Sequence, residues 1–490
     1  METKKSREQE KTPFLDAYKA YLESDPVPFD VPGHKLGNFE TDLSRKLSPC
    51  FSKYDANAPI GLDNLYHAKG VIKEAEDLAA KACHADHCLF SVNGTTGAIL
   101  TRFRSTLHAK DKVIRPRNIH KSVVNGLILS GATPIFVNPF IDEELGVACQ
   151  RRRDDLIKAR DENKDAKAVF IINPTYFGVT SDLKKIVEEA HNRNRIVRCD
   201  EAHGSNFYFS SKLPVSARQA GADITARSRH KNSGSLTQTS LLLVKGKRIE
   251  RLEVKRAFAR FSSTSPYHPL MASLDAARKE RALHGKEILD RCLELSKYAR
   301  EHLNKIPGIH VYNKDYIKKW NTTGVFDIDL TKLVIDVRGL GRFGYDVYKE
   351  IRKESNIQLE LGEVSVVLAI VGPGTTKEHI DRLIQAFERL SKEHYKEGKK
   401  LSVLRYRYTY PIRRRIPRTA YDDPYKILPL KDAVGEISEE TIRAYPPGIP
   451  IILPGEEISK DTITRINFYR REKGQILKDT KEGCIKVVVR

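Results

Sequence analysis

The chain has 490 residues, enough for two or three domains, and its 40% hydrophobic and 30% charged content is that of a globular protein. No apolar run approaches the ~20 residues that a membrane span needs, and the charged N-terminus lacks the apolar segment of a secretory signal, so we expect no membrane partner. Seven scattered cysteines argue against a disulfide framework and predict a cytoplasmic protein, while the formal charge of +21 raises nucleic acid as a partner.

Residues 1–55 are predicted to form an N-terminal arm, in which prolines and glycines between positions 26 and 37 enforce extended and turn conformations. From residue 56 onward, short apolar runs alternate with helical patterns. This alternation of strand and helix predicts an α/β fold with a mostly parallel sheet. A second region with its own strands and helices follows the break at Pro307-Gly308. The apolar runs of the first sheet are residues 89–92, 112–114, 134–137, 168–172 and 195–197.

Several polar residues directly follow these apolar runs, at the strand ends where α/β sheets bind ligands. Residues 93–97 (Asn-Gly-Thr-Thr-Gly) open a helix, so their N–H groups and hydroxyls form an anion cradle. Asp200 ends a strand, and its carboxylate could hold a pyridine nitrogen protonated. His120 follows another strand and could stack on an aromatic ring. A helix cap for Asp200 and a core histidine for His120 are the alternatives, but their shared position at strand ends favours a site.

Lys231 lies in a polar, glycine-containing turn before the apolar run 241–244, with Ser228 and His230 close to it in the sequence. Hydroxyls, backbone N–H groups and cations of this kind can converge on a phosphate. A lysine beside a phosphate pocket is what a pyridoxal phosphate Schiff base requires, because the lysine amine attacks the cofactor aldehyde. We therefore predict pyridoxal 5'-phosphate as the cofactor, with a surface lysine in a basic loop as the alternative.

Two further clusters raise other functions. Residues 83–88 (Cys-His-Ala-Asp-His-Cys) have the side chains of a zinc site, but they are nearly contiguous and no second pair follows, so we predict no metal. The run 405–415 alternates arginine with tyrosine and then adds three arginines, which would suit stacking and phosphate contacts with nucleic acid. An edge strand with solvated arginines explains the same run. We favour the strand and expect no nucleic-acid partner.

Taken together, these stretches resemble the Orn/Lys/Arg decarboxylases among the fold-type I pyridoxal phosphate enzymes. The resemblance extends through nearly the whole chain, is to the short form without an N-terminal wing domain, and is arginine decarboxylase-like. Each marker alone is weak, but their combination is highly specific. The markers are Pro32-Gly33-His34-Lys35, Val92-Asn93-Gly94-Thr95-Thr96, Pro116-Arg117-Asn118-Ile119-His120-Lys121-Ser122, Asn173-Pro174-Thr175-Tyr176, Asp200-Glu201-Ala202-His203-Gly204, Ser228-Arg229-His230-Lys231, Thr264-Ser265-Pro266 and Tyr445-Pro446-Pro447-Gly448-Ile449-Pro450.

The resemblance implies a role for each matching position. Lys231 corresponds to the lysine that forms the Schiff base, Asp200 to the partner of the pyridine nitrogen, and His120 to the histidine stacked on the ring. These three are the implied catalytic residues. Ser263 and Thr264 correspond to a segment that reaches the cofactor phosphate of a neighbouring subunit, which implies a homodimer or larger homo-oligomer with shared active sites. The other implied cofactor-binding residues are Gly94, Thr95, Thr96, Ala202, His203, Ser228 and His230.

The implied fold is an aspartate aminotransferase-like large domain with a mostly parallel sheet (residues 56–305), a smaller α/β domain (306–400) and a C-terminal domain (401–490). The implied reaction is decarboxylation of a basic amino acid, arginine before lysine or ornithine, to an amine for polyamine metabolism. Glu360, in the apolar-alternating strand predicted over residues 357–361, is the candidate for binding the distal cation of the substrate, with a solvated strand-end glutamate as the alternative. An aminotransferase or aldolase on this scaffold stays open, as does a nucleic-acid-binding protein.

Four residues around Lys231 depart from the family pattern, namely Arg227, Arg229, Asn232 and Ser233. The two arginines could lower the pKa of Lys231 through like charge, strengthen the binding of a phosphate, or accompany a shifted substrate. The Lys231 segment itself is intact, so we expect an active enzyme.

Overall fold

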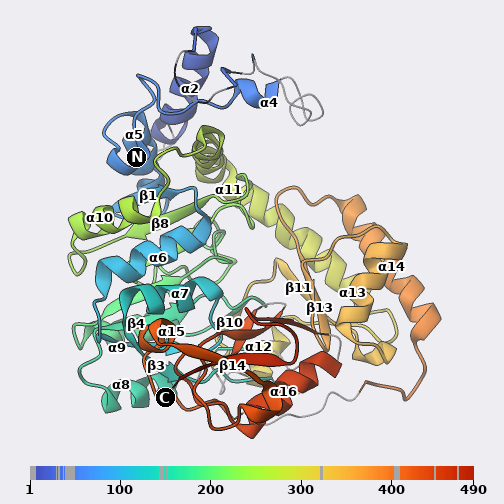
Figure 1. Ribbon diagram of the computed structural model, residues 1–490. Coiled ribbons are helices and arrows are strands. Elements are labelled where there is room, and N and C mark those ends of the chain that lie inside the picture. Colours follow the sequence, from blue (N-terminus) through green and yellow to red (C-terminus); the bar gives the residue numbers. More distant parts are fainter. Residues whose placement is uncertain are drawn as a thin grey trace. The chain divides into compact units, whose positions relative to one another are not determined.

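The computed structural model divides into two compact units, each made of two stretches of the chain (Figure 1). Unit 1 comprises residues 1–106 and 196–289, and unit 2 comprises residues 107–195 and 290–490. The predicted domain boundaries stay predictions. The markers at 32–35 and 445–450 and the basic run 405–415 lie partly outside the described residues. The structure describes residues 7–28, 30, 32, 34–36, 38, 50–142, 148–150, 153–320, 324–401, 409–445, 448–471 and 474–489.

Unit 1 contains four strands whose register brings polar residues to one edge. In order across the sheet, these strands are β1 (His87–Ser91), β8 (Ser240–Val244), β7 (Ile224–Ser228) and β6 (Ile196–Asp200). β6 and β7 are parallel, with Asp200 opposite Ala226. β8 is antiparallel to both neighbours, and its Ser240 lies opposite Ser228 on one side and Ser91 on the other. The C-terminal ends of β1, β6 and β7 therefore lie at the same edge.

The helices of unit 1 form where apolar residues recur at helical spacing, as in α5, which buries Ile72, Ala75 and Ala79. α5 also buries Glu76, whose carboxylate accepts a hydrogen bond from Phe90 N at 2.9 Å, and burial raises the pKa of Glu76 to about 8. This bond ties α5 to β1. The helices are α2 (Pro13–Glu23), α4 (Cys50–Lys53), the 3₁₀ helix η1 (Leu65–His67), α5 (Val71–Ala82), α6 (Gly94–Thr106), α10 (Arg251–Phe261) and α11 (His268–Leu303), which continues into unit 2.

Unit 2 begins with three parallel strands, in the order β4 (Ala168–Ile172), β2 (Lys112–Pro116) and β3 (Thr133–Val137). Among the described strands of the two units that match the predicted sheet, both antiparallel pairs involve β8, and the pairs β2–β3, β2–β4 and β6–β7 are parallel, so the prediction of a mostly parallel sheet is confirmed. The associated helices are α7 (Lys121–Ser130), α8 (Arg153–Glu162) and α9 (Leu183–His191). α7 has a defined beginning and end: the His120 side chain accepts a hydrogen bond from Ser122 N, and Gly131 ends the helix with a φ of 68°.

A second sheet of unit 2 is antiparallel, in the order β12 (Leu361–Gly362), β13 (Val366–Ile370), β11 (Lys332–Asp336) and β9 (His310–Val311). Apolar residues of these strands, among them Val334 and Leu368, pack with Phe177 and Val179 in one core cluster. The other elements of this region are β5 (Val179–Thr180) with β10 (Asp327–Ile328), α12 (Asp315–Trp320), η3 (Arg338–Leu340), α13 (Gly344–Glu354) and α14 (Lys377–His394).

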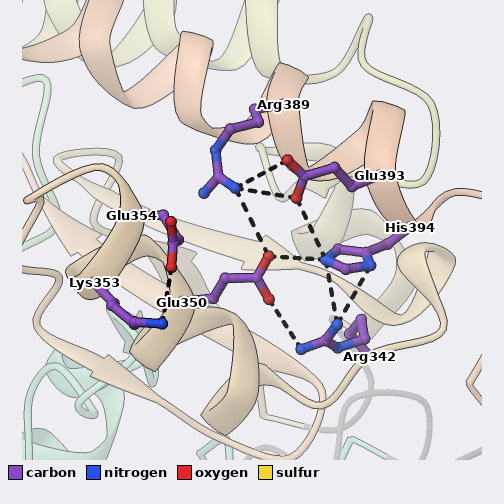
Figure 2. Close-up of polar contacts among 7 residues, drawn as sticks. All are labelled: Arg342, Glu350, Lys353, Glu354, Arg389, Glu393 and His394. Carbon is purple, nitrogen blue, oxygen red and sulfur yellow. Dashed lines mark hydrogen bonds and ion pairs between the residues drawn. The ribbon is translucent and has the colours of Figure 1, made fainter.

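An ion-pair network joins α13 to α14 (Figure 2). Glu350 accepts a hydrogen bond from Arg342 at 2.9 Å, and its other oxygen lies 2.8 Å from His394 Nε2. Arg389 Nη1 lies 3.0 Å from Glu393 and 3.9 Å from Glu350. Two guanidinium groups thus neutralise two carboxylates, and we infer that the network stabilises the packing of the two helices.

The C-terminal region of unit 2 has its own apolar core, which includes Ile442, Ile452, Ile466 and Val487. Its elements are α15 (Pro417–Asp422), β14 (Tyr425–Pro429) paired with β18 (Cys484–Val488), the 3₁₀ helix η4 (Leu430–Asp432), the sheet of β16 (Ile449–Ile452), β15 (Ile442–Tyr445) and β17 (Gln475–Leu477), and α16 (Lys460–Arg471).

The described end of the basic run is engaged in ion pairs within this region. Arg414 Nε lies 2.7 Å from Glu457 Oε2, and Arg415 pairs with Asp423. These guanidinium groups therefore have carboxylate partners within the chain. Across the described ranges, we find no helix with both the length and the apolar character for crossing a membrane.

Candidate active site

Lys231 follows the end of β7, and its amine is in contact with a buried histidine. The Lys231 Nζ atom lies 2.7 Å from Nε2 of His203, and Asn232 Nδ2 donates a hydrogen bond to the carbonyl oxygen of His203 at 3.0 Å. Arg281 holds the same turn by donating to the carbonyl oxygen of Asn232 at 2.9 Å. Because the amine and the imidazole are at hydrogen-bond distance, a proton can pass directly between them.

Asp200 is the last residue of β6 and is buried. Its Oδ1 atom accepts a hydrogen bond from Ala202 N at 3.2 Å, which fixes the carboxylate against the following turn. Since Asp200 lies opposite Ala226 on β7, the carboxylate and the turn that carries Lys231 belong to the same edge of the sheet. Ala202 lies in the turn that follows Asp200 and has only a methyl side chain.

Glu201, which the sequence analysis did not single out, anchors the segment between Asp200 and His203. Its Oε2 accepts a hydrogen bond from the Tyr208 hydroxyl at 2.5 Å, and its Oε1 accepts one from Ala217 N at 2.6 Å. Burial, together with the charge of Glu201, raises the pKa of Tyr208 well above its usual range, so the hydroxyl keeps its proton and remains a donor. In the sequence, only the position of Glu201 between the predicted site residues Asp200 and Ala202 indicated that it could have this anchoring role.

Hydroxyls and an imidazole gather near the N-terminus of α6. Thr95 Oγ1 lies 3.1 Å from Ser240 Oγ, and Ser228 Oγ lies 3.1 Å from His230 Nδ1. Ser228 and Ser240 are opposite each other in register, so both pairs lie at one end of β7 and β8. Gly94 has a φ of +67°, and a side chain added there would meet no atom within 4 Å. The open approach, the hydroxyls and the N-terminus of a 13-residue helix fit a phosphate group.

The two arginines beside Lys231 have a structural role. Arg227 Nη1 lies 2.7 Å from Cys83 Sγ, and its guanidinium lies 3.6 Å from the centre of the Tyr208 ring. Arg229 Nη2 donates to the carbonyl oxygen of Ala277 in α11 at 3.1 Å. Both side chains are buried, and burial followed by the charge of Arg227 lowers the pKa of Arg229 to about 9. These contacts are with protein groups, so we infer that the arginines stabilise the fold around the site.

The remaining predicted residues of unit 1 are exposed. Thr96 is exposed in the first turn of α6, and Ser263 and Thr264 are exposed just after α10 ends at Phe261. Exposure of the two later residues is compatible with the implied contact to a neighbouring subunit, and that contact stays a prediction.

Two predicted site residues belong to unit 2. His120 is exposed at the start of α7, where its Nδ1 atom accepts from Ser122 N at 3.2 Å, so Nε2 carries the proton of the neutral ring. Glu360 is exposed and accepts a hydrogen bond from the Tyr176 hydroxyl. The predicted strand over 357–361 is wrong except at its last residue, because β12 begins only at Leu361. Glu360 thus lies just before a strand rather than within one.

A family model described as "Orn/Lys/Arg decarboxylase, major domain" matches residues 12–378, and the model for the C-terminal domain of the same family matches residues 415–475. The chain belongs to the Orn/Lys/Arg decarboxylase family. The predicted resemblance is therefore confirmed.

Relatives in the family cover almost the whole chain. The arginine decarboxylase of Bacillus subtilis is 39% identical over 484 residues, which are 98% of each chain. The arginine decarboxylase of Halalkalibacterium halodurans is 39% identical over 473 residues, which are 94% of each chain. The crystal structure of the lysine decarboxylase of Francisella novicida covers 97% of this chain and 81% of its own, with a TM-score of 0.83 and 21% identity. This likeness confirms the predicted fold class.

Proposed function

We propose that the chain catalyses the pyridoxal 5'-phosphate-dependent decarboxylation of a basic amino acid, with arginine before lysine or ornithine. The observation that carries the proposal is the 2.7 Å contact between Lys231 Nζ and His203 Nε2. The same edge of the sheet bears Asp200 and, at the start of α6, the Thr95 hydroxyl, which could donate a hydrogen bond to a phosphate. Membership of the family and the two arginine decarboxylase relatives support the reaction and the substrate. They favour decarboxylation over the aminotransferase and aldolase alternatives.

The residues of unit 1 would hold the cofactor at three points. Thr95, Ser228 and His230, with the N–H groups at the start of α6, would bind the phosphate. Asp200 would pair with the ring nitrogen, and Lys231 would provide the amine that links covalently to the aldehyde. Gly94 and Thr96 would extend the phosphate contacts, and Ala202 would lie under the ring.

When bound, the cofactor supplies an electron sink for the electron pair that remains when the substrate carboxylate leaves as carbon dioxide. The negative charge of Asp200, buried at the edge of the sheet, favours a protonated ring nitrogen and so makes the sink effective. The amine of Lys231 delivers a proton to the substrate carbon after carbon dioxide has left. His203 Nε2, at 2.7 Å, returns a proton to that amine.

Further parts of the proposal concern the substrate and the assembly. His120 would lie on the ring face opposite Ala202, and Glu360 would bind the distal cation of the substrate, with its carboxylate oriented by the Tyr176 hydroxyl. Ser263 and Thr264 would complete the phosphate site of a second subunit, which makes the enzyme a homodimer or a larger homo-oligomer. We place it in the cytoplasm, as its cysteine content suggests.

Replacing His203 with glutamine is expected to lower kcat by about 100-fold. The amide can still accept a hydrogen bond from Lys231 Nζ, but it cannot exchange a proton with it. The measurement is kcat as a function of pH. The wild-type profile should contain a pH-dependent limb that comes from this proton exchange, and the profile of the variant should lack that limb. His284→Gln, which replaces a half-exposed histidine in α11, serves as the control and should behave as the wild type. An unchanged kcat and pH profile in folded His203→Gln would exclude His203 from the proton transfer.

A substrate panel tests the proposal as a whole. The purified full-length protein, supplied with pyridoxal 5'-phosphate, is expected to release carbon dioxide from arginine with a higher kcat/KM than from lysine or ornithine. The product should be agmatine, detected by mass spectrometry. A keto acid in place of the amine would contradict decarboxylation and support an aminotransferase. Activity on lysine or ornithine above that on arginine would contradict the substrate assignment alone.

A further inference from the structure

Arg117 and Glu456 form a buried, bidentate ion pair within unit 2. Arg117 Nη1 pairs with Glu456 Oε1, and Arg117 Nη2 lies 2.6 Å from Glu456 Oε2. Each side chain is only 1% exposed. Glu456 is held further by Leu453 N, which donates to Oε2 at 2.9 Å, and the Arg117 guanidinium lies 4.9 Å from the centre of the Phe136 ring. Since both ions are desolvated, loss of either partner leaves a buried charge without the ion that pairs with it directly.

The position of Arg117 in the chain links this pair to His120. Arg117 directly follows β2, and His120, three residues later, is the residue that caps α7. Only Asn118 and Ile119 separate the two residues, between the end of a strand and the start of a helix. We infer that a shift of the Arg117 backbone would also move the ring of His120.

The C-terminal region also contacts the other end of α7. Arg418, in α15, donates from Nε to the carbonyl oxygen of Ile128 at 2.7 Å and from Nη2 to that of Leu129. These carbonyls belong to the last turn of α7, where a positive charge is stabilising. A Cβ atom added to Gly131 would approach Arg418 Nη1 within 2.9 Å, which shows how closely the side chain lies against the helix end.

We propose that the C-terminal region holds α7 at both ends, and that Glu456 is a positioning residue for His120, acting through Arg117. The inference rests on the proposed function, because it is there that His120 contacts the cofactor. The segment 415–475 contains none of the predicted catalytic residues, and the inference gives it the role of positioning the His120 segment. Glu456 lies 339 residues from Arg117 in the chain, so only folding brings this group to the His120 segment.

The test compares Glu456→Gln with Glu457→Gln in the full-length protein. Glu457 is the next residue, and its side chain pairs with the exposed Arg414, so it is a matched control. In Glu456→Gln, amide hydrogen exchange is expected to accelerate over residues 117–124, while the control stays at the wild-type rate. The dissociation constant for pyridoxal 5'-phosphate, followed by cofactor fluorescence, should rise about 10- to 100-fold in Glu456→Gln, as expected for a slightly misplaced contact.

A double-variant cycle separates positioning from general loss of stability. With His120→Ala as the background, Glu456→Gln should have no further effect on cofactor affinity, because the group that it positions is gone. If the two effects are additive, Glu456 does not act through His120 and the proposal is wrong. Unchanged exchange over residues 117–124 in Glu456→Gln would also overturn it.

A second variant keeps the inference testable if Glu456→Gln does not fold. Arg418→Gln removes the half-buried α15 side chain that contacts the C-terminal end of α7. It should accelerate exchange over residues 121–131 and weaken cofactor binding in the same way, and no change in either would contradict the proposal. Hydrogen exchange needs no catalytic activity. If the wild-type protein releases no carbon dioxide but the variants show the expected faster amide exchange, the proposed function would be contradicted. The positioning of the His120 segment would still be supported.

Discussion

Lys231→Ala is expected to abolish carbon dioxide release from arginine and to remove the near-visible absorption band of the cofactor-loaded protein. The methyl group cannot form the covalent link to the aldehyde, and it removes the amine that contacts His203. The loss in kcat should be at least about 1000-fold, since a nucleophile and a proton donor are lost together. The measurements are an absorption spectrum of the purified protein and a carbon dioxide assay under saturating arginine.

The control for this experiment is Lys245→Ala. Lys245 is an exposed lysine just after β8, at the opposite edge of the same sheet from Lys231. Its variant should keep both the absorption band and the wild-type rate. Retention of the band and the rate in Lys231→Ala would show that another amine binds the cofactor, and the proposed site would then be wrong.

Asp200→Asn is expected to lower kcat by about 100- to 1000-fold, the range for removal of one preorganised electrostatic contact. Asparagine has almost the same shape and can still accept a hydrogen bond from Ala202 N, so the turn after β6 should be preserved. What is lost is the negative charge that favours a protonated ring nitrogen. The variant should therefore bind the cofactor and show the absorption band, yet release carbon dioxide slowly.

The matched control is Asp86→Asn, which removes an exposed carboxylate beside the opposite edge of the sheet, where Asp86 accepts from Gly246 N. Its kcat should equal that of the wild type. Thermal unfolding of both variants, followed by circular dichroism, verifies that each is folded. A folded Asp200→Asn enzyme with an unreduced kcat would mean that the carboxylate does not act on the ring nitrogen.

Sequence patterns alone predicted the strand ends at which the candidate site lies. Asp200 and the segment 93–97 were located correctly at strand ends, because a buried strand is a short apolar run and the polar residues that end it are neighbours in the chain. The pattern failed at Glu360, where a five-residue alternation predicted a strand that is only two residues long. So short a segment does not distinguish a strand from an extended loop.

The tertiary structure alone decided the roles of the charged residues. Arg227 and Arg229 are close to Lys231 in the chain, and this proximity suggested a role in the chemistry of the lysine. In the folded chain their partners are Cys83 and Ala277, so we infer that the two arginines stabilise the fold instead. The same holds for Arg117, whose partner Glu456 lies in the C-terminal region. The local order of residues determines which backbone segments become strands and helices. The direction of a long charged side chain depends on which distant group removes it from water, and that is settled only when the chain is folded.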